Sequence, residues 1–308
     1  MTGFDADWLA RREPFDAQAR NPALAAGFAR SLRGARGNAR QDGAWRVIDL
    51  AAGTGSNFRA LAPLLGGDQE WLLVDHDPML RAAQAGAIAQ WAERAGWSCH
   101  VMGDTVVVQA GAVCWRARAH ALDLANSLDA LDFAAFDAVT TAAFLDLVSA
   151  DWLDRLVDRL TLARRPLLAV LTVDGRRRWS PMLSADQRLH DAFRRHQAGD
   201  KGFGPALGSD ATAALECRLV ARGFAVSTAP SDWRIGPPHG EMLWRMVDEA
   251  NAVACQSEAS AAAIFGDWRA QRIVQIQDGR LSLEVGHQDL LALPADTVGE
   301  SPQSVRLS

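Results

Sequence analysis

Two glycines and an acid beside one short apolar run are the residues of this chain best placed to bind a ligand. The run at residues 47–50 contains Asp49, and Gly53 and Gly55 follow it before a helical pattern begins. Glycine permits the backbone angles of a tight turn and lets a ligand approach main-chain groups closely. A helix N-terminus behind such a turn attracts negative charge. The segment therefore predicts a strand, a glycine turn and a helix that together bind a cofactor.

A second apolar run, at residues 71–74, ends at Asp75 and is followed by His76, Asp77 and Pro78. A proline in this position is well placed to open a helix. A carboxylate at the tip of the second strand can accept hydrogen bonds from both hydroxyl groups of a ribose. The two units together predict that the ligand contains a nucleoside.

These residues need a sheet to position them, and strands alternating with helices from residue 45 to 174 predict a parallel one. The expected strands are 46–50, 71–75, 115–123, 136–141 and 167–173, with an additional hairpin within 98–115. Before the sheet, helical spacing of apolar residues predicts a helix over 4–33 that breaks near Pro14 and Pro22. The glycine-rich segment 34–43 reads as a linker.

The pattern changes after residue 174. The segment 176–181 contains three consecutive arginines and reads as a basic loop. Further along we expect helices at 184–200, 210–222 and 240–275, a strand from Phe224, a loop at 231–234 and a last strand at 281–286. Residues 175–210 would then form an insertion over the sheet.

Composition and charge exclude several classes of protein. A chain of 308 residues, of which 49% are hydrophobic, can bury a large core, and its net charge of −5 gives no electrostatic reason to expect nucleic acid. No apolar run reaches the ~18–20 residues of a membrane span, and residues 1–12 lack the apolar stretch of a secretory signal. We therefore expect a cytoplasmic protein without a membrane partner. The 4 cysteines lie far apart, so neither a zinc site nor a disulfide framework is expected.

The glycine turn resembles motif I of the class I S-adenosylmethionine (SAM) methyltransferases, which usually reads Asp-x-Gly-x-Gly-x-Gly. Asp49, Gly53 and Gly55 match this motif, and Ala51 replaces its first glycine. The Asp-His-Asp-Pro-Met-Leu segment at 75–80 is similar to the pattern that follows in the same family. The resemblance covers about residues 45–290 as a fold, although its specific motifs lie within 46–147.

The resemblance implies roles for the residues of the turn and of the second strand. The turn, with Ala51 and Thr54, would lie against the methionine moiety of SAM. Asp49 would lie near the SAM ammonium group, although bracing of the loop is an alternative role. Asp75 would hold the ribose, and His76 would flank the adenine unless it is a surface histidine.

Further roles fall on the ends of the third and fourth strands. By the same resemblance, Asp123 would accept a hydrogen bond from the adenine amine and the backbone of Leu124 would meet a ring nitrogen. Asp123 could instead simply cap a helix. Thr141 would lie near the sulfonium. Asp146 lies just beyond the fourth strand, where ligands of α/β proteins bind. It is a candidate general base or substrate contact, and an acid at a helix start is the alternative.

The helix expected at 184–200 offers groups that could handle a substrate. His190 is a candidate base because an imidazole titrates near neutral pH. Arg194, His196 and the more distant Trp233 are candidate substrate contacts, and arginines can clamp a carboxylate or a phosphate. A solvated charged helix is the alternative reading. The arginines at 176–178 could attract an anionic substrate or form a surface loop, and Arg12 and Arg20 could reach SAM from a lid.

The sequence thus predicts a seven-stranded, mostly parallel, doubly wound sheet of the class I methyltransferase type. The expected parts are an N-terminal helical cap at 1–44, a SAM-binding domain at 45–296 with an insertion near 175–210, and a polar tail at 297–308. The expected reaction moves a methyl group from SAM to an oxygen or nitrogen of a small molecule. No metal is expected, and the sequence leaves a homodimer open.

Two alternatives to this function remain open at this point. An NAD(P)-dependent oxidoreductase could share the fold, although the dinucleotide fingerprint would need a glycine at Phe58. A non-catalytic module that binds SAM would carry the same motifs.

Overall fold

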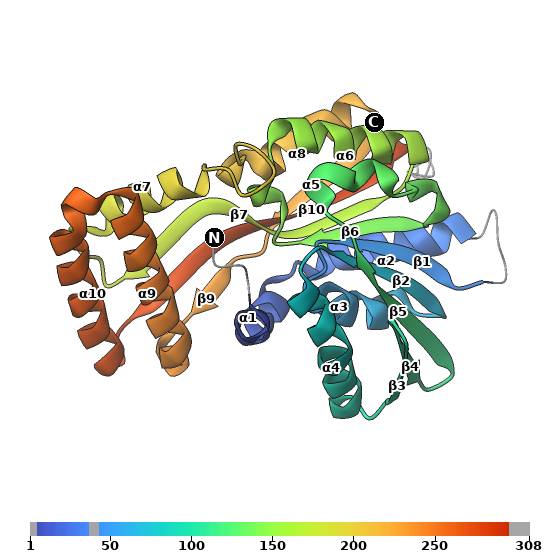
Figure 1. The fold of residues 1–308 in the computed structure, drawn as a ribbon, viewed down its shortest axis with the longest axis horizontal. Coiled ribbons are helices and arrows are strands. Elements are labelled where there is room, and N and C mark those ends of the chain that lie inside the picture. Colours follow the sequence, from blue (N-terminus) through green and yellow to red (C-terminus); the bar gives the residue numbers. More distant parts are fainter. Residues whose placement is uncertain (1–4, 37–42, 296–308) are drawn as a thin grey trace, which may run out of the picture.

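A single sheet of ten strands organises the computed structural model, which describes residues 5–36 and 43–295 (Figure 1). The strands are β1 (Trp45–Leu50), β2 (Gln69–Asp75), β3 (Ser98–Met102), β4 (Thr105–Ala110), β5 (Val113–Ala121), β6 (Ala138–Ala142), β7 (Leu167–Ser180), β8 (Phe224–Pro230), β9 (Trp233–Ile235) and β10 (Ser282–Pro294). Their order in the sheet is β3-β4-β5-β2-β1-β6-β7-β10-β8, and β9 pairs with β10.

The strand directions match the sequence-based expectation. The strands β5, β2, β1, β6 and β7 are mutually parallel, whereas β10 runs antiparallel to both β7 and β8. The expected additional hairpin is formed by β3 and β4, which extend the sheet at one edge. The prediction of a mostly parallel, doubly wound sheet is therefore confirmed, with β3, β4 and β9 added to its seven strands.

Helices cover both faces of this sheet. They are α1 (Ala6–Ala19), α2 (Pro22–Arg36), α3 (Ser56–Leu65), α4 (Pro78–Arg94), α5 (Leu124–Ser127), α6 (Ala150–Ala163), α7 (Asp186–Gln197), α8 (Ala211–Ala221), α9 (Gly240–Ser257) and α10 (Ala262–Gln277). Two short 3-10 turns also matter for the site, η3 (Leu145–Leu147) and η4 (Gly208–Asp210). Local signals explain some of the boundaries. Pro78 opens α4, as the sequence predicts, and Asp77 caps this helix.

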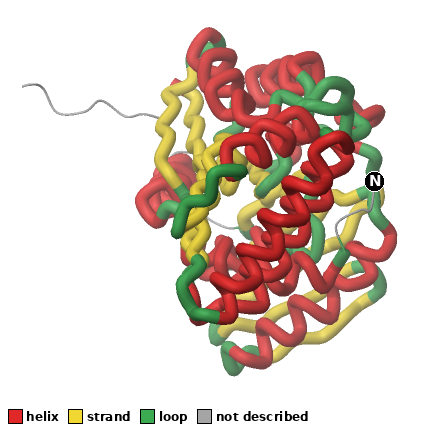
Figure 2. The backbone as a smooth tube through the Cα atoms, turned by 90° about the vertical axis from the view of Figure 1, so that its left-hand side faces the viewer, coloured by secondary structure: helices red, strands yellow, loops and turns green. Residues whose placement is uncertain are grey.

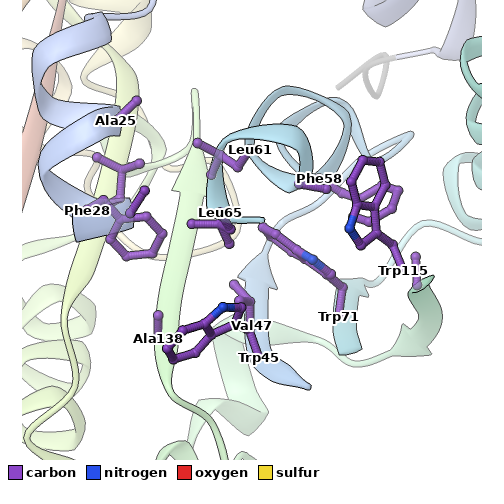
Figure 3. Close-up of a cluster of buried hydrophobic side chains, with 14 of the residues drawn as sticks. Ala25, Phe28, Trp45, Val47, Phe58, Leu61, Leu65, Trp71, Trp115 and Ala138 are labelled. Atoms are coloured by element: carbon purple, nitrogen blue, oxygen red, sulfur yellow. The ribbon is translucent and has the colours of Figure 1, made fainter. Parts of the chain in front are cut away.

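The core consists of two layers on the sheet and a third cluster beyond it. On one face the apolar side chains of α2, α3 and α4 pack against the strands, with tryptophans such as Trp71 and Trp115 around Phe58 (Figure 3). On the other face α5, α6 and α8 form the second layer. These layers hold the carboxyl ends of β1, β2 and β6 in fixed positions, and that edge carries the motif residues.

The third cluster belongs to a smaller lobe built on the extensions of β7 and β10. The two strands continue as a long ribbon, and α7, α9 and α10 gather at its far end (Figure 1). Seen from that end, these helices stand in front of the strands (Figure 2). Apolar residues of α1 and β9 complete the cluster, so α1 connects this lobe to the main sheet.

Several sequence-based expectations about this lobe are wrong. The segment 176–181 is not a loop, because β7 continues to Ser180 and pairs with β10 as far as Ser282. The last strand extends to Pro294 instead of ending at 286, and Trp233 begins the short strand β9. The helix expected over 240–275 is interrupted between Ser257 and Ala262.

At the N-terminus, the expected break near Pro22 is confirmed, but α1 runs through Pro14 without interruption. The side chains of Trp8 and Phe15 are buried on either side of this proline, and their packing offsets the lost backbone hydrogen bond. Most of the predicted linker and the predicted polar tail lie outside the described residues. No helix in the described part of the chain is long and apolar enough to cross a bilayer.

Candidate functional site

A cavity lies at the carboxyl ends of β1 and β6, beside the point where the order of strands in the sheet reverses. Ligands of open α/β sheets bind at such points. Its walls come from the glycine turn, from the ends of β1, β2 and β6, and from α1. The lining residues are Leu9, Arg12, Asp16, Asp49, Ala51, Ala52, Gly53, Thr54, Ser56, Asn57, Asp75, Leu80, Ala142, Ala143, Phe144 and Leu147.

The turn after β1 has the backbone that the sequence predicts. Gly53 has a φ of 54°, and Gly55, which precedes α3, has a φ of 81° in the left-handed region. A Cβ atom at Gly55 would lie 3.3 Å from the side chain of Leu73 in β2. Two hydrogen bonds fix the turn, because the Gly53 amide donates to Asp75 at 2.8 Å and the Gly53 carbonyl accepts from Gln84 at 2.8 Å.

Asp49 is fully buried at the floor of the cavity. Its Oδ1 accepts hydrogen bonds from the Asn57 amide and the Thr140 hydroxyl, both at 2.8 Å. Its Oδ2 is buried and has no hydrogen-bond partner among the described residues. Burial raises the pKa of this carboxyl to about 6, against the lowering effect of the two hydrogen bonds. The site therefore contains a buried acidic oxygen that a cationic or hydrogen-bond-donating ligand could satisfy.

Asp75 stands at the end of β2 and also lines the cavity. Its Oδ2 accepts the Gly53 amide and its Oδ1 accepts the Asp77 amide at 2.9 Å, so the carboxylate braces two turns at once. Each carboxylate oxygen can accept more than one hydrogen bond, which leaves capacity for a ligand. The next residue, His76, points largely into solvent, with 74% of its side chain exposed.

The cavity is covered by α1, whose residues Leu9, Arg12 and Asp16 form its outer wall. Glu13 of α1 pairs with Arg59 of α3, with both oxygens of its carboxylate engaged. A Cβ atom placed on Gly53 would lie 2.9 Å from a methyl carbon of Leu9, which shows how closely the helix sits on the glycine turn.

A second set of contacts ties α1 to the floor of the cavity and to the smaller lobe. Arg20, just after α1, donates to Asn57 at 2.7 Å, and Asn57 in turn donates to Asp49. The indole of Trp233 in β9 donates to Asp16 at 2.9 Å, and the guanidinium of Arg12 lies 4.8 Å from the Trp233 ring. Trp233 therefore anchors α1 in this structure.

The volume of the cavity is about 110 Å³. Pockets that bind small molecules usually measure about 300–1,000 Å³. With α1 in this position, the cavity is too small for a nucleoside cofactor. A ligand of that size needs the cavity to widen.

Asp146 lies in η3, between Phe144 and Leu147, which both line the cavity. Its side chain is buried, and its Oδ1 has no hydrogen-bond partner among the described residues. Burial raises its pKa to about 6, while the backbone amides of Asp146 and Val173 and the charge of Arg12 act in the opposite direction. The carboxyl therefore lies beside the cavity, on the side of β7.

Three other predicted cofactor contacts are not among the residues that line the cavity. Asp123 is exposed and caps α5, accepting hydrogen bonds from the backbone amide of Ala125 and the side chain of Asn126. Leu124, the first residue of α5, is buried in the core. The Thr141 hydroxyl is buried and donates to the carbonyl of Leu50, which joins β6 to β1.

The predicted substrate residues of α7 belong to the smaller lobe, on another element than Asp146. His190 is half-buried, and burial lowers its pKa, as do the charges of Arg177 and Arg194. Arg194 is exposed and lines a separate surface cavity of about 550 Å³ between α7 and η4. His196 lies in the last turn of α7, where its carbonyl accepts a hydrogen bond from Lys201.

Sequence reasoning missed Asp16, Asn57 and Phe144 as cavity residues. Asn57 carried a usable signal, since it is a polar residue in the first turn of the helix behind the glycine turn. Asp16 carried none, because its position depends on how α1 docks. Within the described residues, no group of three or more His, Cys, Asp or Glu side chains could hold a metal ion.

No protein-family model matches the sequence, and no curated protein matches it either. Among solved structures, it is similar to a cyclopropane-fatty-acyl-phospholipid synthase-like protein from Lactobacillus casei, at TM-score 0.44 and 11% identity over 92% of this chain and 99% of that one. It is also similar to a cyclopropane synthase from Mycobacterium tuberculosis, at TM-score 0.41 and 11% identity over 87% and 83% of the two chains.

A third similar structure is Haemonchus contortus phosphoethanolamine N-methyltransferase 2, at TM-score 0.42 and 13% identity over 95% of this chain. The present chain spans 59% of the length of that protein. Likenesses at this level say nothing about the reaction. The order and directions of the strands carry the conclusion about architecture: five parallel strands, followed by an antiparallel strand inserted before the last one. The chain has the class I SAM methyltransferase fold.

Proposed function

We propose that this protein is a SAM-dependent methyltransferase that acts on an oxygen or nitrogen atom of a small molecule. One observation carries the proposal: the glycine turn, Asp49 and Asp75 meet at a single cavity, and one buried oxygen of Asp49 has no partner among the described residues. The motif residues Asp49, Gly53 and Asp75, identified in the sequence, therefore line one cavity in the structure.

The charges and shapes of these groups fit SAM. Its ammonium group would satisfy Oδ2 of Asp49, because a buried carboxylate is best compensated by a cation that also donates hydrogen bonds. The ribose hydroxyls would donate to Asp75, and the methionine moiety would lie against the backbone of Gly53. When bound, SAM supplies an electrophilic methyl group on a positively charged sulfur.

Asp146 is the proposed general base. Its pKa of about 6 leaves the carboxyl mostly ionised at neutral pH, yet close enough to neutrality to accept a proton from an acceptor hydroxyl or amine. Its burial beside the cavity also keeps bulk water away. His190, the other sequence-based candidate, lies in α7 and has a lowered pKa, so we assign it a different role below.

The helix α1 is the proposed lid. Its inner side contacts the glycine turn and closes the cavity to about 110 Å³, so cofactor entry would need the helix to move away. Return of the lid would exclude water and hold the reactants close together, and both effects contribute to the rate of a transfer reaction.

The oxidoreductase alternative has less support. The position where a dinucleotide fingerprint needs glycine is held by Phe58, which is fully buried in the core against Trp71 and Trp91. A large ring there leaves no room for the close helix-to-strand packing that the third glycine provides.

Isothermal titration with S-adenosylhomocysteine tests the cofactor site. We expect the variant Asp75→Asn to weaken binding by roughly tenfold or more, because hydrogen bonds to a charged group are worth about 1.5–3 kcal/mol. The matched control is Glu70→Gln, an exposed residue of the same strand, for which we expect an unchanged Kd. Circular dichroism would establish that both variants are folded.

Two results would count against the proposal. If the folded wild-type protein shows no heat of binding with either SAM or S-adenosylhomocysteine, the cofactor assignment is wrong. If binding is present but Asp75→Asn retains the wild-type affinity, the ligand lies elsewhere than beside β2.

A further inference from the structure

Three consecutive arginines of β7 differ in how their charges are compensated. Arg176 binds Asp174 and Asp232, with hydrogen bonds of 2.7 Å to each. Arg178 lies 3.6 Å from Glu284 on the neighbouring strand. Arg177 between them has no ion pair with any acid of the described residues. Of the three arginines, Arg177 is therefore the one whose guanidinium is available to bind an acidic group.

The Arg177 side chain points toward α7. Its Cζ lies 3.9 Å from the centroid of the Phe193 ring, and its Nη1 is buried without a hydrogen-bond partner among the described residues. Glu249 of α9 is the acid whose charge acts on Arg177, although it forms no ion pair with it. A cation held by an aromatic ring on one side still needs acceptors for its N–H groups.

His190 lies on the same side of α7 as Phe193, because residues three apart in a helix are neighbours. Its Nδ1 is also buried without a hydrogen-bond partner in the described part of the chain. The charged groups that act on its ring are Arg177 of β7 and Arg194 and Asp191 of α7. Two buried polar atoms without partners therefore lie on neighbouring elements, β7 and α7, near enough for the charge of Arg177 to act on the His190 ring.

Such a pair is costly in a folded protein. Each buried polar atom without a partner lowers the stability of the fold, and two at one place are unusual. A single group with several acceptor oxygens would satisfy the Arg177 guanidinium and a protonated His190 together. Carboxylates and phosphates have this geometry.

We propose that Arg177 and His190 bind an acidic group, a carboxylate or a phosphate, on the substrate of the proposed methyl transfer. This proposal rests on that proposed function for its biological meaning, while the anion site itself can be tested alone. Arg177 and His190 are binding residues in this account, and Asp146 remains the base.

Asp146 lies beside β7, and Arg177 belongs to this strand. Val173, whose backbone contacts Asp146, and Arg177 lie on the same strand. The strand bulges between them, because they stand opposite His287 and Val285, which are only two residues apart on β10. The methyl-accepting atom of the substrate and its anionic group would therefore both lie along β7.

Nuclear magnetic resonance of the histidine side chains tests this site without the natural substrate. The protein would be labelled with ¹³C-histidine, and the His190 signal would be assigned with the variant His190→Gln. Inorganic phosphate, and separately acetate, would be titrated at constant ionic strength against a chloride control. We expect either anion to raise the pKa of His190 by about one unit, since a nearby opposite charge favours the protonated ring.

Variants distinguish this site from a general salt effect. The shift should disappear in Arg177→Met and persist in Arg178→Met, which removes the neighbouring arginine on the other side of the strand. Arg177→Lys, which keeps a charge, should retain part of the shift and serves if the methionine variant does not fold. A larger effect of acetate assigns a carboxylate, and a larger effect of phosphate assigns a phosphate.

An unchanged pKa of His190 in the wild-type protein with both anions would overturn the proposal. An equal shift in Arg177→Met would overturn it as well. Thermal unfolding with SAM, run on the same samples, separates this failure from failure of the proposed function. If SAM does not raise Tm, the cofactor site is wrongly assigned. If SAM raises Tm but the anions leave the pKa of His190 unchanged, only the anion site at Arg177 is wrong.

Discussion

Asp49 and Asp146 combine burial with an unpaired carboxylate oxygen, and both have a pKa raised to about 6. In the unfolded chain such carboxyls titrate near 4. The folded protein therefore binds their protons more tightly, so its stability decreases as the pH rises from about 4 to 6. Above about pH 6 both carboxyls are ionised, and the full loss of folding stability from their burial is present. Stability is lower there because both carboxyls are then charged while buried.

Replacement of Asp146 by asparagine should remove one of these charges. A rise of about two pKa units corresponds to at most ~3 kcal/mol. We expect Asp146→Asn to change the free energy of unfolding more favourably at pH 7.5 than at pH 4.5. At pH 4.5 the wild-type carboxyl is already protonated, so the substitution removes no charge there. Urea unfolding at the two pH values measures this difference. The exposed Asp129→Asn is the control, and an Asp146→Asn effect equal at both pH values would contradict the assignment.

Sequence reasoning at this scale worked for groups fixed by their own strand. Asp49 and Asp75 lie at the ends of buried strands and Gly53 follows the first of them, so their common edge was predictable. Asp123 has the same pattern but faces solvent as a helix cap, which shows that an acid after a strand is ambiguous by itself. The sequence could not reveal that Arg177 lacks an ion pair. The acids that pair with the two arginines beside it, Asp232 and Glu284, come from distant segments.

At the scale of elements, the parallel strands were predicted best, because their buried residues form continuous apolar runs bounded by turns. The extension of β7 was missed because its arginines resemble a loop. In the structure Arg178 pairs across to Glu284, and Trp179 packs into the smaller lobe. The interruption between α9 and α10 was also missed. There Glu258 pairs with Arg188 and Arg195 of α7, a contact that no local pattern reveals.

The lid role of α1 makes a prediction about rates. Leu9 lies against the glycine turn, and its loss in Leu9→Ala should destabilise the closed position by about 1 kcal/mol. We expect S-adenosylhomocysteine to associate roughly fivefold faster in this variant. Stopped-flow tryptophan fluorescence would follow binding, since Trp8 lies in α1.

Leu64→Ala is the matched control for this measurement, because Leu64 is 50% exposed on α3 and is not among the cavity residues. An association rate of Leu9→Ala equal to that of the wild type would mean that α1 does not limit access to the cavity.

At the scale of the molecule, the ribbon of β7 and β10 joins two functional regions. The main sheet carries the proposed cofactor cavity, the smaller lobe carries the proposed anion site, and α1 contacts both. The sequence predicted the sheet and an insertion near 175–210. It did not predict that residues 233–285 belong to the same lobe, because this association depends on long-range pairing of β9 and β10.

The most direct test of the central claim is thermal unfolding of the full chain with SAM, S-adenosylhomocysteine, NADH or NADPH. A ligand present at 100 times its Kd stabilises the native state by about 2.7 kcal/mol, which should raise Tm by several degrees. We predict this rise with SAM and S-adenosylhomocysteine and none with the nicotinamide cofactors. A rise with NADH or NADPH alone, or with none of the four ligands, would contradict the assignment of the cavity to SAM.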